Sequence, residues 1–116
     1  MKNIYMDYAA TTPAKQEVVD SMLPFFTKHF GNASSMHQMG NKAERELITS
    51  RKTVADFINS KPRELYFTSG GSESDNWAIK GIARANKGNH IITSKIEHHA
   101  VLHTCQALED EGFEVT

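Results

Sequence analysis

The spacing of hydrophobic and polar positions changes near the middle of this chain. In the first half, apolar side chains recur three to four residues apart, a spacing that predicts amphipathic helices. In the second half, short apolar runs alternate with helical patterns, which predicts strand–helix units and a parallel sheet. The pattern therefore predicts two helices followed by an α/β arrangement.

The first predicted helix follows a short extended piece over residues 3–8. It should start with Thr12 as its N-cap and Pro13 in the first helical position, and Pro24 should kink or end it. The apolar stripe of this helix is formed by Val18, Met22, Phe25 and Phe26.

The second predicted helix is longer and follows a loop rich in turn-forming residues at 30–35. It should run from about Met36 to residues 59–60, and Pro62 prevents any continuation. Its expected buried side carries Ala43, Leu47, Val54, Phe57 and Ile58.

The second half of the chain reads as alternating strands and helices. Ligands of a parallel sheet bind beyond the carboxyl ends of its strands, where two loops of this chain should lie. The last predicted strand stops without a turn, so we expect a piece of a larger α/β protein. The predicted strands are 64–68, 90–93 and 113–116, and the predicted helices are 72–86 and 99–111.

Composition narrows the class of protein. The chain has 116 residues, one domain at most, and its 13 basic and 14 acidic residues are mixed, with no basic stripe for nucleic acid. No apolar run reaches membrane-spanning length, and Asp7 interrupts any signal peptide. The single cysteine, Cys105, excludes an intrachain disulfide and fits a reducing cytoplasm. We therefore expect a cytoplasmic protein with no membrane segment.

The first candidate site is the turn into the helix predicted at 72–86. Gly70 and Gly71 allow close approach of a ligand, and Ser72 stands three residues before Asp75, as an N-cap with an acidic partner does. The N–H groups of such a helix start can bind a phosphate. The pattern is neither a Walker loop nor a dinucleotide fingerprint. The alternative is a structural turn in which Ser72 only caps the helix.

The second candidate site is the histidine pair after the strand predicted at 90–93. His98 could stack on a planar ligand and move protons, or it could be an ordinary polar loop residue. His99 and His103 are four apart on a helix, but no third ligand lies at a defined spacing, so no metal site is predicted. Cys105 shares an apolar helical face and should be a core thiol, and Lys80 lies well inside its helix, facing an undetermined direction.

Four motifs in this order resemble the cysteine desulfurases, pyridoxal-phosphate enzymes of the class V aminotransferase group. The resemblance implies an incomplete three-layer α/β sandwich, the start of the large domain of a fold type I enzyme. Residues 1–14 would be an extended segment on the small-domain side, and 15–116 the first part of the cofactor domain, truncated at Thr116. The motifs are Tyr5-Met6-Asp7-Tyr8-Ala9-Ala10-Thr11-Thr12-Pro13, Phe30-Gly31-Asn32-Ala33-Ser34-Ser35-Met36-His37, Phe67-Thr68-Ser69-Gly70-Gly71-Ser72-Glu73-Ser74-Asp75-Asn76, and His90-Ile91-Ile92-Thr93-Ser94-Lys95-Ile96-Glu97-His98-His99-Ala100-Val101-Leu102.

The resemblance also implies roles for particular residues. Gly71 and Ser72 would bind the phosphate of pyridoxal 5'-phosphate, and His98 would stack on its ring and assist proton transfer, whereas His99 is not expected to act. Relatives more often have threonine at Ser72, and they have proline where this chain has Ala33. Serine keeps the hydroxyl, while alanine loosens the loop around position 33.

The implied reaction removes sulfur from L-cysteine to give alanine and an enzyme persulfide. A homodimer would then pass the sulfur to an acceptor scaffold for iron–sulfur cluster or thiocofactor assembly. The cofactor's lysine, the aspartate, the arginine and the nucleophilic cysteine of relatives lie beyond Thr116, so the 116 residues alone should be inactive. The alternative is a standalone, non-enzymatic α/β module that binds a phosphate ligand or a protein.

Overall fold

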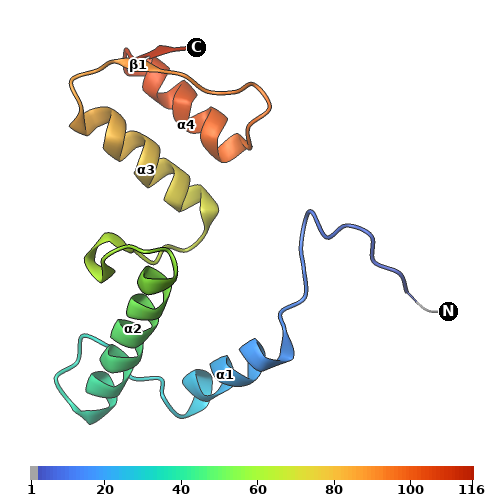
Figure 1. Ribbon diagram of the computed structural model, residues 1–116, viewed down its shortest axis with the longest axis vertical. Helices are drawn as coiled ribbons and strands as arrows, with labels where there is room; N and C mark the ends of the chain where they lie inside the picture. Colours follow the sequence, from blue (N-terminus) through green and yellow to red (C-terminus); the bar gives the residue numbers. More distant parts are fainter. Residues whose placement is uncertain (1–2) are drawn as a thin grey trace. The chain divides into compact units, whose positions relative to one another are not determined.

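The computed structural model describes residues 3–116, and the chain divides into two compact units, Met1–Leu65 and Tyr66–Thr116 (Figure 1). No helix within the described residues is long and apolar enough to cross a membrane. The first unit contains α1 (Gln16–Thr27), α2 (Gln38–Phe57) and the 3-10 turn η1 (Pro62–Glu64). The second unit contains α3 (Gly71–Ala85), β1 (His90–Ile91), α4 (His99–Asp110) and β2 (Glu114–Val115).

Helix α1 differs from its prediction at both ends. It begins at Gln16 with Lys15 as N-cap, so the expected start at Thr12 and Pro13 is wrong. A threonine caps a helix only when its hydroxyl accepts a nearby N–H, whereas the first backbone bonds of α1 run to the Lys15 carbonyl. Pro24 does not end the helix, because it lies in the last turn and its carbonyl accepts the Lys28 N–H at 2.8 Å.

The start of α2 is shaped by a tight loop. His37 is the N-cap, and its Nδ1 accepts the Gly40 N–H at 3.2 Å. Gly40 is buried, and a Cβ there would overlap the Ser35 carbonyl oxygen, so the loop can approach the helix only at a glycine. The helix ends at Phe57, two residues before Asn59 takes a left-handed φ of 56°.

The predicted buried side of α2 is wrong. Only Gly40 and Ala55 are buried in this helix, and Phe57 is 90% exposed. Within its unit, α2 packs mainly on the single short turn η1, which is too small to cover a stripe of five turns. The α1 stripe is likewise exposed, since no residue of α1 is buried.

The strand predicted at 64–68 is also wrong. Residues 62–64 form η1, and 65–68 form no regular element and pair with no strand among the described residues. A strand needs a neighbouring ladder, and the Leu65 carbonyl instead accepts a bond from the Arg51 guanidinium. Tyr66 then packs edge-on against Trp77, with ring centroids 4.9 Å apart.

The prediction of a parallel sheet whose strands are connected by a helix is confirmed in the second unit. β1 and β2 are parallel, with His90 opposite Glu114, and α4 connects them. Gly112 ends α4 with a left-handed φ of 101°. The core of the unit lies on α4 and consists of Thr104, Cys105 and Leu108.

Helices α3 and α4 pack side by side and run in the same direction, so both begin at the same end of the unit (Figure 1). Near their opposite ends, Arg84 of α3 donates to the Glu111 carboxylate at 2.6 Å. This ion pair raises the pKa of Arg84 and lowers the pKa of Glu111, in both cases chiefly through the hydrogen bond. The fold thus places two helix N-termini together at one end.

Candidate functional site

The N-terminus of α3 exposes unbonded backbone donors. Gly70 is the N-cap, and the first backbone bond runs from the Ser74 N–H to the Gly70 carbonyl at 3.1 Å. The N–H groups of residues 71–73 precede this bond and have no intrahelical acceptor. A Cβ added at Gly70 or Gly71 would meet nothing within 4 Å, so the backbone is open to a ligand. This end of α3 is therefore suited to an anion.

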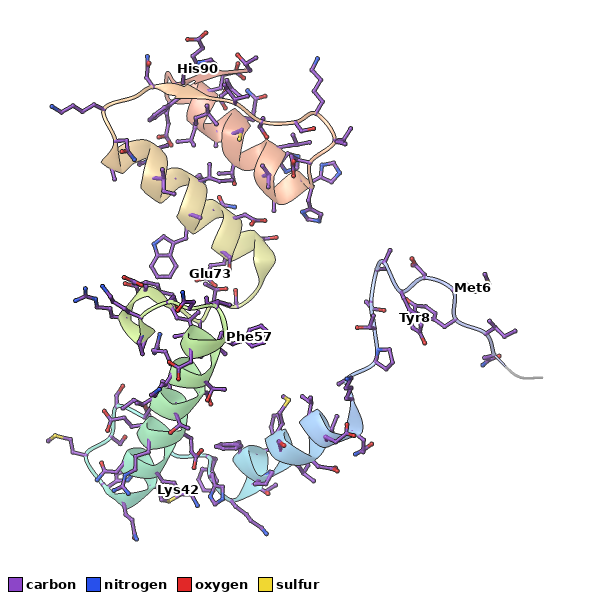
Figure 2. The ribbon with its side chains drawn as sticks, in the orientation of Figure 1. Met6, Tyr8, Lys42, Phe57, Glu73 and His90 are labelled. Carbon is purple, nitrogen blue, oxygen red and sulfur yellow. The ribbon has the colours of Figure 1, made fainter. Side chains whose placement is uncertain are left out.

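The capping pair of α3 is not the predicted one. Ser72 lies inside the helix and is not its N-cap, and the acidic partner is Glu73 rather than Asp75. The Ser69 hydroxyl and N–H donate to the Glu73 carboxylate at 2.7 and 2.6 Å. These bonds, the side-chain one above all, lower the pKa of Glu73. Glu73 lies at the start of α3 (Figure 2), where its carboxylate binds Ser69 and stabilises the turn. The Ser72 hydroxyl does not cap the helix.

The N-terminus of α4 is capped by the candidate histidine itself. His98 is the N-cap residue, with an extended backbone at φ −61° and ψ 147°. Its Nδ1 accepts the Ala100 N–H at 3.1 Å. The bond holds the imidazole at the helix start, so its orientation is set by the backbone of α4.

Ser72 and His98 line the same open pocket, of about 440 Å³, between the first turns of α3 and α4. Gly71, the third residue singled out from the sequence, is the first residue of α3 but does not line this pocket. The complete lining is Ser72, Asn76, Lys80, His98, His99, Ala100, His103 and Thr104.

The pocket wall is rich in hydrogen-bond donors and contains no carboxylate. Lys80 is half-buried in it, and its ammonium forms no ion pair within residues 3–116. Asn76 donates to the Ser72 carbonyl at 3.0 Å. The sequence analysis left the direction of Lys80 open and gave Asn76 no role, although the spacing of four from Ser72 to Asn76 to Lys80 places all three on one helical face. Such a lining favours a negatively charged ligand over a cation.

The other histidines of α4 also stand at this pocket. The rings of His99 and His103 stack with centroids 5.2 Å apart, and His99 lines the pocket although no role was expected for it. Among residues 3–116, no group of three or more ligating side chains is arranged to hold a metal ion. Cys105 is 3% exposed, which confirms the prediction of a core thiol.

The chain is similar along nearly its whole length to one group of enzymes. The family model for class-V aminotransferases matches residues 4–116. The cysteine desulfurase IscS of Clostridium botulinum (strain Hall) is 59% identical over 117 residues, covering 99% of this chain and 30% of that protein. IscS of Methanosarcina thermophila is also 59% identical, over 99% of this chain and 29% of its own length.

Solved structures show the same likeness. A NifS-like protein superposes with a TM-score of 0.93 at 37% identity, over 99% of this chain and 32% of its own. A structure of SspA in complex with cysteine superposes with a TM-score of 0.88 at 46% identity, over 97% of this chain and 33% of the SspA chain. This chain thus spans about 30% of the length of the curated relatives it matches. The comparisons do not favour a standalone, non-enzymatic module.

Proposed function

The chain belongs to the class-V aminotransferase family, and we propose that it forms the amino-terminal part of a pyridoxal-phosphate-dependent cysteine desulfurase. The proposal is carried by one observation: Ser72 and His98, from two separate motifs, line the same donor-rich pocket. The name of the curated relatives at 59% identity supports the same activity. The complete enzyme would remove sulfur from L-cysteine, leaving alanine and a persulfide.

The residues of the pocket fit pyridoxal 5'-phosphate. The N–H groups of residues 71–73 and the Ser72 hydroxyl would hold the phosphate, because an open helix N-terminus next to a hydroxyl is an anion site. The His98 imidazole would lie against the ring from the start of α4. When bound, the cofactor supplies an electron sink for bonds at the α-carbon of an amino acid. The part of this chain is to bind and orient that group.

Two further pocket residues, Lys80 and Asn76, have a task in this proposal. Lys80 supplies a positive charge that forms no ion pair within residues 3–116, and this charge raises the local concentration of an anion. Asn76 holds the first turn of α3 through its bond to the Ser72 carbonyl.

The remaining properties of the enzyme are part of the same proposal. L-cysteine is the substrate, the enzyme is a cytoplasmic homodimer, and a scaffold protein accepts its sulfur for iron–sulfur cluster or thiocofactor assembly. Residues 1–14 would be a segment of the small-domain side, and 15–116 the first part of the cofactor domain. The Schiff-base lysine, the pyridine-nitrogen aspartate, the carboxylate-binding arginine and the persulfide cysteine are not supplied by these 116 residues.

A binding titration tests the cofactor site directly. Pyridoxal 5'-phosphate is added to the full chain while the fluorescence of Trp77, its single tryptophan, is followed. We expect quenching that saturates, and a dissociation constant at least about tenfold higher for Ser72→Ala, since a hydrogen bond to a charged group contributes about 1.5–3 kcal/mol. Ser50→Ala, on exposed α2, is the matched control and should bind normally. Equal affinities for all three proteins would remove Ser72 from the site.

An activity test addresses the missing groups. The full chain with pyridoxal 5'-phosphate and L-cysteine should release no sulfide, and borohydride should fix no cofactor to a lysine. A protein that also contains the sequence encoded downstream of Thr116 should do both. Sulfide release by the 116 residues alone would contradict the proposal.

A further inference from the structure

We infer that the Ala100 N–H fixes the tautomer of His98, so that Nδ1 carries the lone pair and Nε2 carries the proton. The proposal assigns Ala100 as a positioning residue that acts through its backbone. Its use in proton transfer rests on the proposed function, whereas the tautomer itself does not.

The geometry of the cap determines the tautomer. A backbone amide can only donate a hydrogen bond, and the distance from the Ala100 nitrogen to His98 Nδ1 is 3.1 Å. Nδ1 must therefore be the accepting nitrogen, and a neutral imidazole then carries its proton on Nε2. The opposite tautomer would set two N–H groups against each other at the start of α4.

The consequence concerns which proton His98 can give or take. The Nδ1 edge of the ring faces the Ala100 amide, and Nε2 has no hydrogen-bond partner among the described residues. A ligand in the pocket therefore meets an N–H donor at Nε2. Neutral His98 therefore offers a hydrogen-bond donor at Nε2, and it can take up a proton only at Nδ1, after the cap bond breaks. The helix start thus prepares His98 to donate a hydrogen bond from Nε2 to a ligand in the pocket.

The chain contains its own control. His37 caps α2 in the same way, through a bond from the Gly40 N–H to its Nδ1 at 3.2 Å, but it belongs to the other unit and does not line this pocket. His99 and His103 lie beside His98 but accept no backbone N–H. The cap and the pocket can therefore be separated by comparing histidines within one molecule.

Nitrogen NMR on the uniformly labelled full chain tests the inference. For His98 we expect a pyridine-type Nδ1, a pyrrole-type Nε2 and a scalar coupling across the hydrogen bond to the Ala100 nitrogen. His37 should show the same pattern, with its coupling to Gly40, while His99 and His103 should show averaged tautomers. A proton on Nδ1 of His98, or averaging equal to that of His99, would overturn the inference.

A variant and a ligand separate this inference from the cofactor proposal. Ala100→Pro removes the donor but no intrahelical bond, and it should release His98 to mixed tautomers without changing His37. If this variant does not fold, the coupling in the unaltered chain still decides. Pyridoxal 5'-phosphate should then shift the Nε2 signal of His98. A fixed tautomer with no ligand shift would leave the inference standing and contradict the cofactor site.

Discussion

The two units of this chain bury their apolar residues to very different extents. In the first unit, Gly40 and Ala55 are the buried residues of α2, and the apolar stripes of α1 and α2 face outward. In the second unit, α4 packs its middle into a small core around Leu108. The sequence patterns of α1 and α2 are more amphipathic than that of α4, so the pattern alone does not create a core. A helix needs a neighbour of sufficient area within its own unit.

The largest effect should come from the core of the second unit. Leu108 is fully buried, so Leu108→Ala should lower the free energy of unfolding of that unit by about 2–5 kcal/mol. Leu47→Ala, at a residue of α2 that is 41% exposed, is the matched change in the first unit and should cost under about 1 kcal/mol. Urea unfolding followed by Trp77 fluorescence would measure the loss of stability in Leu108→Ala. Hydrogen exchange on both variants would compare the losses of stability in the two units. Equal losses would remove the contrast between the units.

The next effect tests where the first unit is tightly packed. Gly40→Ala would force a Cβ into the Ser35 carbonyl and should destabilise the first unit by about 1–3 kcal/mol. Gly81→Ala in α3 is its counterpart, because a Cβ there meets only Trp77 Cδ1 at 3.8 Å. That change should stabilise the second unit by about 0.5–1 kcal/mol through helix propensity. Thermal unfolding of both variants shows whether each change stabilises or destabilises its unit. An unchanged stability of Gly40→Ala would show that the loop around Ser35 moves to accommodate the added Cβ.

A smaller effect concerns the charge of the pocket. Lys80→Gln should weaken binding of inorganic phosphate or pyridoxal 5'-phosphate about fivefold, because an ammonium near an anion in a partly exposed site contributes about 1 kcal/mol. High salt should erase the difference. Lys87→Gln, at an exposed lysine of the same unit that does not line the pocket, should bind like the unaltered chain. A loss shared by both variants would mean that general charge, and not the pocket, attracts the ligand.

The smallest effect should come from the turn at Glu73. Its pKa is lowered in the folded chain by the bonds from Ser69, so the ionised carboxylate is the stabilising form. That contribution is present above the unfolded pKa of about 4.3 and is lost as pH falls through the lower, folded value. Glu73→Gln should therefore lower stability slightly at pH 7 and flatten the decline in stability below the unfolded pKa, because the variant has no carboxylate to protonate. Denaturation curves across this range, with Glu64→Gln in the first unit as control, would show it.

Sequence reasoning succeeded where the local signal is strong. The glycine turn, α3, α4 and the parallel pairing of β1 with β2 all followed from alternating patterns and from Gly112. It failed where the outcome depends on a neighbour: the strand at 64–68 has no ladder, and the stripe of α2 has no cover. The helix start at Thr12 failed because the Pro13 ring is compatible with a helix but does not require one.

The site shows the same division. Ser72 and His98 could be named because their motifs resemble a family, and the structure places both at one pocket. Asn76 and Lys80 belong to that pocket only because α3 and α4 begin at the same end, which no local pattern encodes. Ser69, the true partner of Glu73, was overlooked because a serine four residues before a glutamate is not the usual capping spacing.

The burial of Cys105 makes its rate of chemical labelling a measure of how often the second unit opens. Its sulfur is the only thiol of the chain and is nearly sealed within the second unit. Alkylating reagents can reach this sulfur only when α4 separates from the residues packed against it. The labelling rate therefore reports the opening of the second unit and not of the first.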